Sequence, residues 1–285
     1  MLISYIMGEI KFSNVENNLD QFLIDHQFKW VGIKDAISYK NEIYLSYTNK
    51  IKENCYSVGV LKSKKNYKLE NIRFENFFSF EECVNIENSD KFSNRKYFGG
   101  FQAGGRMDFK NNFLFLTVGD YRNWALPQDE NSNFGKILKI DLATSEYEKL
   151  SKGHRNPQGL FIINDDYILS TEHGPKGGDE INLIKTKNIS GIQNFGWPIA
   201  SYGEHYNSVS ANYKVRKIAP MHKSHIKYGF IEPVKNFTPS LGISQIEKSN
   251  KDNNAVFVSS LKNMEVLEYD INIINEELIL KDNLK

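Results

Sequence analysis

A strand–turn–strand unit that recurs along the chain is the feature that most constrains its fold. In residues 105–117 a Gly is followed twelve residues later by a Thr, and residues 159–171 repeat that spacing with an Asn or Asp turn in between. Each copy continues into a loop of Gly and acidic residues and a further strand-like run. A weaker copy covers residues 32–47. One supersecondary unit is therefore used several times.

The spacing of these units predicts a β-propeller. Four short strands about every 40 to 50 residues are typical of a propeller blade, and at that spacing 285 residues supply about six units. The first half of the chain has no sustained helical period, so the pattern is nearly all β. We predict one all-β domain over residues 1–285, a six-bladed β-propeller of four-stranded antiparallel blades. A β-sandwich is the alternative, and the constant Gly-to-Thr spacing favours the propeller.

Residues 207–228 are basic and loosely patterned, and they predict a loop insertion in the propeller. We expect His222 and His225 within it to lie at the surface. That pair alone does not predict a metal site.

The composition excludes several classes of partner. Lys and Arg number 36 against 35 Asp and Glu, and no clustered basic face stands out, so we expect no nucleic-acid partner. No run is long and apolar enough for a membrane span.

The first residues, MLISYIMGEIKFSNVENN, lack the basic region and cleavage site of a signal peptide. The protein is thus cytoplasmic, or the sequence starts inside a longer precursor. Cys55 and Cys83 could pair, but two thiols say little about the compartment.

Two polar loops at the ends of one predicted hairpin carry most of the chemical information. They are GHRNPQG (residues 153–159) and EHGPKGGD (residues 172–179). Loops held on a rigid sheet are common positions for binding and catalytic groups. They could equally be solvated turns in which Gly and Pro serve the backbone alone. In a propeller, Asp120 would join both loops at the end of the central axis.

Several ordered motifs resemble the glucose/sorbosone dehydrogenase family. They are GHRNPQGL, TEHGPKGGDEINLI and NFGWPIASYGEHY, with GGR and TVGD upstream and FTPSLG downstream, between about Trp30 and about Tyr269. The resemblance implies a six-bladed propeller that holds pyrroloquinoline quinone (PQQ) and calcium, with a sugar substrate and an electron acceptor. It also implies export to the periplasm, and it leaves a homodimer open. Family members have more chain at both ends, so the propeller could be incomplete at both ends.

The resemblance also implies roles for single residues. Arg155 matches the arginine that contacts the quinone carbonyls, and Asn156 matches a neighbouring quinone contact. Gly174 and Pro175 match the pair whose backbone carbonyls bind calcium, a cation that takes oxygen ligands. Asp120 matches the carboxylate that orients the catalytic base.

The same resemblance implies roles for two more residues. Asp179 matches an acidic residue of the same pocket. Lys262 lies near the basic residues that pair with the cofactor carboxylates. Oxidation of a sugar needs a base for the hydroxyl proton, and a guanidinium and a metal would stabilise the charge that develops on the quinone.

One position departs from the family pattern. The family's base is a His just before the Gly-Arg pair, but this chain reads FQAGGR (residues 101–106), so Gln102, or Phe101, stands in its place beside the cofactor. Neither can accept a proton at neutral pH. His173 could act as the base, whereas we expect His154 to be structural. The main hypothesis is PQQ- and calcium-dependent oxidation of an aldose or related alcohol. The alternatives are a non-catalytic propeller that binds a sugar or another ligand, and a calcium-dependent lactonase.

Overall fold

The chain folds into a series of antiparallel sheets. The computed structural model describes residues 2–6, 9–13, 15–23, 31–64, 71–85, 100–187, 189–206, 213–249, 254–274 and 277–283. Within these ranges the helical elements are short: α2 (Tyr213–Ile218) and the 3₁₀ turns η1 (Leu19–Gln21), η2 (Leu126–Gln128) and η3 (Ile226–Tyr228). The all-β prediction is confirmed. No helix in the described part of the chain is long and apolar enough to cross a membrane.

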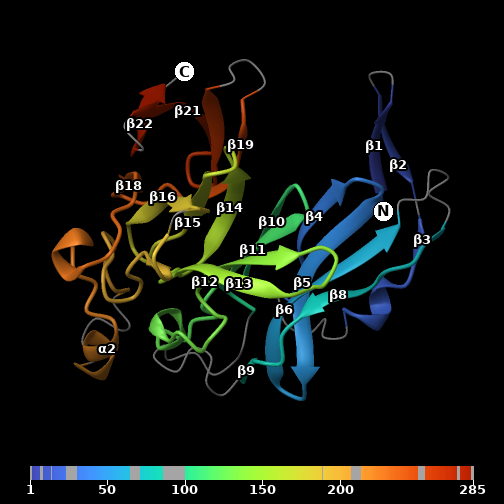
Figure 1. The fold of residues 1–285 in the computed structure, drawn as a ribbon, viewed down its shortest axis with the longest axis horizontal. Helices are drawn as coiled ribbons and strands as arrows, with labels where there is room; N and C mark the ends of the chain where they lie inside the picture. The colour runs from blue at the N-terminus through green and yellow to red at the C-terminus, as the bar shows by residue number, and fades with distance from the viewer. Residues whose placement is uncertain are drawn as a thin grey trace.

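Four large sheets, each built on four antiparallel strands, make up most of the described chain (Figure 1). The first contains β4 (Ile33–Tyr39), β5 (Glu42–Lys52), β6 (Cys55–Lys64) and β8 (Glu75–Ser79), and β9 (Val84–Asn85) also pairs with β6. The second contains β10 (Gly104–Lys110), β11 (Phe113–Val118), β12 (Lys136–Asp141) and β13 (Tyr147–Lys152), extended by the parallel β17 (Gln193–Asn194). The third contains β14 (Pro157–Ile162), β15 (Tyr167–Glu172), β16 (Asp179–Lys185) and β18 (Lys235–Phe237). The fourth contains β19 (Ile243–Lys248), β20 (Ala255–Ser260), β21 (Glu265–Ile274) and β22 (Glu277–Asn283).

Two smaller pairings lie near the N-terminus. The strands β1 (Leu2–Ile6) and β2 (Glu9–Ser13) form an antiparallel hairpin, and β3 (Glu16–Asn17) pairs in parallel with β7 (Asn71–Ile72). The four large sheets follow one another around an arc (Figure 1), and the first strands of consecutive sheets adjoin: β4 with β10, β10 with β14, and β14 with β19. The arrangement is propeller-like. The number of six blades stays a prediction.

The hydrophobic core lies between neighbouring sheets. In β11, Leu114 and Leu116 pack towards the first sheet, whereas Phe115 packs towards the third. In β15, Ile168 packs towards the second sheet and Leu169 towards the fourth. Side chains of a strand alternate between its two faces, so each inner sheet is covered on both sides. Each fully buried aliphatic side chain contributes about 1.5–3 kcal/mol of transfer free energy.

The repeated units share a register shift and a hydroxyl that crosses to the next sheet. The first strand of each large sheet has a register shift, and a hydroxyl on the second strand reaches the first strand of the next sheet. These bonds run from Ser46 to the Gly105 carbonyl, from Thr117 to the Pro157 carbonyl (3.3 Å) and from Thr171 to the Ser244 carbonyl. A Cβ at Gly159 would overlap the Thr171 hydroxyl. In that pair the Thr hydroxyl needs the space that Gly leaves, whereas at Gly105 an added Cβ would meet Lys34 of the preceding sheet and φ is 96°.

The two cysteines form a disulfide between β6 and the segment before β9. Cys55 and Cys83 have Cα atoms 5.4 Å apart. The pairing that the sequence left open is present, and it closes a loop of the first sheet.

The segment predicted as an insertion corrects one expectation. His225 was expected at the surface, yet only 1% of it is exposed. Its backbone N–H donates to Glu232 Oε1 (2.9 Å), and its ring lies 3.6 Å from Glu180 Oε1. One carboxylate from β16 and one from seven residues further along the chain border this buried ring. His222 is half-buried and stacks on Tyr228, with ring centroids 3.8 Å apart. Residues 207–212 lie outside the described residues, and the insertion as a whole stays a prediction.

Candidate functional site

Three residues that the sequence singled out meet at one end of the second and third sheets. Gln102 precedes β10, Asp120 follows β11, and Arg155 precedes β14. In the amide orientation that satisfies both neighbours, the Gln102 nitrogen donates to Asp120 Oδ1 at 2.7 Å and its oxygen accepts from Arg155 Nη2 at 2.7 Å. One amide thus links a carboxylate to a guanidinium. We call Gln102, Asp120 and Arg155 the central triad.

Backbone contacts hold the loops of the central triad together. The Tyr121 N–H donates to the Gln102 carbonyl (3.0 Å), and the Asp120 N–H donates to the Arg155 carbonyl (2.9 Å). Gln102 and Tyr121 have φ values of 58° and 47°, in the left-handed region. Such backbone is unfavourable for residues other than Gly, and it persists at functional sites where the surroundings enforce it.

Asp120 is fully buried and has donors on both oxygens. Besides Gln102, the Arg122 N–H donates to Oδ1 (2.7 Å) and the Trp197 indole N–H donates to Oδ2 (2.8 Å). Burial raises the pKa of Asp120 to about 7, although Arg155 and these donors pull it down. The carboxyl group therefore changes its charge near neutral pH.

Arg155 points its guanidinium at the loop that follows β15. Its Nη1 donates to the carbonyls of His173 (2.9 Å) and Gly174 (2.8 Å), and its Cζ lies 5.4 Å from the centre of the Trp197 ring. Burial lowers the pKa of Arg155, and Asp120 opposes that shift. Because a guanidinium stays protonated in proteins, Arg155 supplies a fixed positive charge.

Behind Arg155 lies a second layer of buried polar groups. Glu172 accepts from the Arg155 backbone N–H and bonds His154 Nδ1 at 3.0 Å. The other His154 nitrogen pairs with Ser151 Oγ at 2.8 Å. Both ring nitrogens of this fully buried histidine are therefore occupied within the protein, which agrees with the structural role expected for His154.

His173 differs from His154 because it keeps a nitrogen without a partner. Its Nε2 is buried and makes no hydrogen bond, and Arg155 Nε shares this property. Burial lowers the pKa of His173, and Asp179 opposes the shift. The ring is thus neutral near pH 7 and able to accept a proton.

The other residues predicted from the sequence, Asp179, Asn156 and Lys262, lie outside the central triad. Asp179 accepts from the Gly174 N–H (3.0 Å) and the Gly242 N–H (2.6 Å), so it joins the loop after β15 to the loop before β19. Asn156 binds the Gln158 amide through Oδ1 at 2.9 Å. Lys262 is exposed in the β20–β21 turn, and its Nζ donates to a backbone carbonyl of that same loop before β19.

The predicted calcium ligands, Gly174 and Pro175, give a weaker fit. The Gly174 carbonyl already accepts from Arg155 at 2.8 Å, and the Pro175 residue is buried. Among the described residues, no group of three or more His, Cys, Asp or Glu side chains is arranged to hold a metal ion. Calcium takes about six to eight oxygen ligands, and two carbonyls supply only part of that number.

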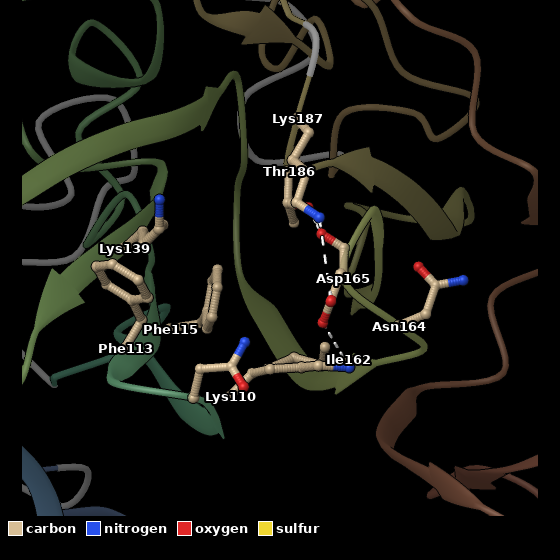
Figure 2. Close-up of a pocket in the computed structure, with 10 residues that line it drawn as sticks. Lys110, Phe113, Phe115, Lys139, Ile162, Asn164, Asp165, Thr186 and Lys187 are labelled. Carbon is tan, nitrogen blue, oxygen red and sulfur yellow. Dashed lines mark hydrogen bonds and ion pairs between the residues drawn. The ribbon is translucent and has the colours of Figure 1, made fainter.

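A separate cleft of about 140 Å³ lies at the opposite ends of the same strands. Figure 2 shows Asp165 between Lys110 and Thr186, with Phe113 and Phe115 across the cleft. Lys110 pairs with Asp165 at 3.1 Å. This cleft contains none of the residues singled out from the sequence.

Three residues near the central triad were not named as site residues from the sequence. Trp197 lies in the NFGWPIASYGEHY motif, so its position near the site was signalled in part. Glu172 stands directly before His173 in the EHGP motif, but nothing in the motif shows that its carboxylate points back to Arg155. Arg122 follows the TVGD motif, and only the structure places it beside Asp120.

Comparisons with known proteins agree with the family suggested by these motifs. The family model described as Glucose / Sorbosone dehydrogenase matches residues 31–284. Aldose sugar dehydrogenase YliI of Escherichia coli is 28% identical over 193 residues, which cover 61% of this chain and 48% of that protein. Quinoprotein glucose dehydrogenase B of Acinetobacter calcoaceticus is 31% identical over 137 residues, 40% of this chain and 28% of that protein. The chain therefore spans half the length or less of these curated relatives.

Solved structures show the same fold. A glucose dehydrogenase crystal structure superposes with a TM-score of 0.69 at 20% identity, covering 91% of this chain and 75% of the other. The soluble aldose sugar dehydrogenase from Escherichia coli, in its apo-form, gives a TM-score of 0.65 at 23% identity, covering 90% and 73%.

Proposed function

Because the chain belongs to the glucose/sorbosone dehydrogenase family, we propose that it oxidises an aldose sugar or a related alcohol with PQQ as the hydride acceptor. One observation carries the proposal. The central triad joins residues from three separate loops. It places the fixed guanidinium of Arg155 next to His173, whose Nε2 makes no hydrogen bond. The six-bladed propeller belongs to the same proposal, with the central triad at the end of its axis.

The buried donors fit a quinone. Arg155 Nε and His173 Nε2 are buried without hydrogen-bond partners, and such groups are costly unless a ligand satisfies them. PQQ would supply the redox chemistry, taking the hydride from the sugar carbon. Arg155 would hold the quinone oxygens and stabilise their negative charge, with Asn156 beside it and Lys262 near the cofactor carboxylates. Calcium at Gly174 and Pro175 would share the Gly174 carbonyl oxygen with the positive guanidinium of Arg155, so we derive no step through calcium.

Within the protein, each residue of the site has a separate task. His173 accepts the proton of the sugar hydroxyl at Nε2, since a base is needed as the hydride leaves the carbon. Gln102 cannot take this proton, but it fixes the positions of Asp120 and Arg155. Asp120 in turn holds the Trp197 ring by the 2.8 Å bond to its indole N–H.

We also propose a periplasmic or secreted location. The Cys55–Cys83 disulfide supports it, because such bonds persist mainly in oxidising compartments. A small or protein electron acceptor would then reoxidise the cofactor. A homodimer belongs to the same set of proposals.

A titration of the full chain with PQQ in the presence of calcium tests the proposal through the quinone absorbance. We expect saturable binding and bleaching of the quinone band when an aldose is added. His173→Gln should keep the binding and lose the bleaching. His222→Gln, a matched change at the half-buried histidine stacked on Tyr228, should behave like the wild type. Absence of PQQ binding would refute the proposal.

The alternative is a propeller that binds a sugar or another ligand without oxidising it. The occupied amide of Gln102 in place of the family's base favours this alternative. Binding of PQQ without bleaching in the wild type, together with bleaching in Gln102→His, would establish it.

A further inference from the structure

Two side-chain amides, those of Gln128 and Asn194, bind each other next to the loops of the central triad. Gln128 lies in η2, within the loop between β11 and β12 that also carries Asp120, and Asn194 lies in β17. The Gln128 Nε2 donates to Asn194 Oδ1 at 3.1 Å, and the Asn194 Nδ2 donates to Gln128 Oε1 at 2.8 Å. Because each amide donates and accepts, the two bonds fix both the distance and the orientation between the two segments. We call Gln128 and Asn194 the amide pair.

The amide pair holds the backbone around Trp197. The Gln128 Nε2 also donates to the Trp197 carbonyl at 2.7 Å, and Asn194 Oδ1 also accepts from the Gly196 N–H at 3.0 Å. The Trp197 N–H donates to the Gly153 carbonyl at 3.0 Å. Both backbone polar groups of Trp197 are therefore bonded to residues from other loops.

The turn that leads to Arg155 is packed against the amide pair as well. A Cβ at Gly153 would lie 2.5 Å from Asn194 Oδ1 and 2.9 Å from Gln128 Nε2. Gly153 also has a φ of 77°, in the left-handed region that favours glycine. Its N–H donates to the carbonyl of Pro127 at 3.1 Å. Three loops thus meet at the amide pair, and they carry Asp120, Arg155 and Trp197.

The side chain of Trp197 connects this arrangement to the central triad. Its indole N–H donates to Asp120 Oδ2 at 2.8 Å, and its ring centre lies 5.4 Å from Arg155 Cζ. Only 4% of Trp197 is exposed, so protein encloses the ring. Because the indole is rigid, a displacement of the Trp197 backbone moves its N–H relative to Asp120.

The segment that carries Gln128 is itself fastened at its backbone. Lys136 is fully buried, and its Nζ donates to the carbonyls of Leu126 and Pro127, both at 3.1 Å. The Asp129 N–H also donates to the Leu126 carbonyl at 3.1 Å. The Gln128 side chain therefore starts from a fixed point, and its amide sets the position of Trp197.

We propose that Gln128 and Asn194 are positioning residues, which place the Trp197 indole against Asp120 and Arg155 for the oxidation. The inference rests on the proposed function, because it assigns two further residues to that reaction. Both act through Trp197 and its bond to Asp120. Catalysis is sensitive to such placement, since a displacement of about 1 Å can lower a rate about a hundredfold.

Gln128→Met tests the inference, because methionine has a similar length and no charge but lacks the amide. Gln193→Met is the matched control. The Gln193 Nε2 donates to the Lys185 carbonyl at 2.8 Å, and its Oε1 accepts from the Lys185 N–H at 2.9 Å. Both variants lose an amide that binds a backbone carbonyl, so their effects on stability should be similar. Of the two glutamines, Gln128 is the one that binds Trp197.

The first readout is the indole N–H signal of Trp197 in proton–nitrogen NMR spectra of the full chain without PQQ, identified by its loss in Trp197→Phe. Burial raises the pKa of Asp120 to about 7, and the Trp197 N–H is among the donors that hold it down. The signal should therefore follow the titration of Asp120 in the wild type. In Gln128→Met the midpoint should rise by about half a pH unit or more, because the donor is displaced. Asn194→Leu should shift it in the same direction, and Gln193→Met should leave it unchanged.

The second readout is the quinone absorbance of the protein loaded with PQQ and calcium. Gln128→Met should lower the rate of bleaching at saturating aldose by about tenfold to a hundredfold. The KM for the aldose should change much less, because Trp197 acts on the charged groups of the central triad and not on sugar binding. Gln193→Met should bleach the quinone at the wild-type rate.

Three outcomes would overturn the inference. One is an unchanged Trp197 signal and midpoint in both Gln128→Met and Asn194→Leu. Another is an equal shift in Gln193→Met, which would leave the amide pair with a general structural role. The third is a wild-type rate of bleaching in Gln128→Met. If the midpoint shifts as expected but the wild type neither binds nor bleaches PQQ, the placement of Trp197 by the amide pair stands and the proposed function alone has failed.

Discussion

Replacing Asp120 with Asn should change how the stability of the protein depends on pH. Burial raises the pKa of Asp120 to about 7, from an ordinary value of 3.8. The folded protein therefore binds this proton more tightly than the unfolded chain. A group of this kind stabilises the fold fully below its unfolded pKa, and the contribution is lost as the pH rises through the folded pKa.

The size of the effect follows from the shift. A difference of about three pKa units corresponds to about 4 kcal/mol in total, at about 1.36 kcal/mol for each unit. Only the part of this free energy that is lost between pH 5 and about pH 7 falls in the pH range in which unfolding is measured. The stability of the wild type relative to Asp120→Asn should thus fall by about 2–3 kcal/mol between about pH 5 and pH 8.

Urea unfolding of both proteins across this pH range measures the difference. Comparing differences removes any constant effect of the asparagine on packing. Asp141→Asn is a matched control, because backbone N–H groups lower the pKa of Asp141 and its titration lies below this range. A wild-type curve parallel to that of Asp120→Asn between pH 5 and 8 would show that Asp120 is already ionised, and the burial argument would be wrong.

Two further changes test the loops and the contacts between sheets. Thr171→Val should cost about 1–3 kcal/mol in urea unfolding, because it leaves the partly buried Ser244 carbonyl of the fourth sheet without its donor. Thr186→Val removes a hydroxyl whose bond to the Asp165 carbonyl is exposed, so it should cost less. Equal losses would contradict the role of the Thr171 hydroxyl. Gly119→Ala should cost about 1–3 kcal/mol or more and weaken PQQ binding, because the new Cβ overlaps the Gln102 carbonyl. Gly191→Ala adds a Cβ that meets no atom, although its φ of 79° makes alanine costly for the backbone. It should leave PQQ binding intact, and a similar loss of PQQ binding in both variants would contradict the overlap.

The repeat in the sequence predicted the fold because its residues act through local geometry. A Gly and a Thr at constant spacing mark a shifted first strand and the hydroxyl that crosses to the next sheet, and this requirement recurs in each unit. The number of blades is different, since it depends on how the sheets close around an axis and not on any one of them. Burial within the segment 213–228 was harder to predict for a related reason. His225 is buried by contact with Glu180 and Glu232, and neither residue is adjacent to it in the sequence.

The clustering of candidate residues was predictable where the motif residues themselves take part in it. Asp120, Arg155 and His173 were singled out from their loops, and the structure joins all three through Gln102 and the backbone. Their chemical roles stay predictions. Glu172 could not be found in this way, because its carboxylate acts on the backbone of Arg155 from the opposite strand of the hairpin. A motif shows which residue types are present, whereas the direction of a side chain depends on the sheet register.

The position of Gln102 also limits where the proton of the reaction can go. Its amide has one donating and one accepting end, and both are engaged, by Asp120 and Arg155 respectively. A neutral histidine in the same place would meet the same two neighbours and would have no nitrogen left for a substrate. Gain of activity in Gln102→His would therefore require Arg155 to move away from residue 102, towards a bound quinone. Without that movement the unpartnered nitrogen of His173 is the better acceptor. Loss of bleaching in His173→Gln, with no gain in Gln102→His, would assign the proton to His173.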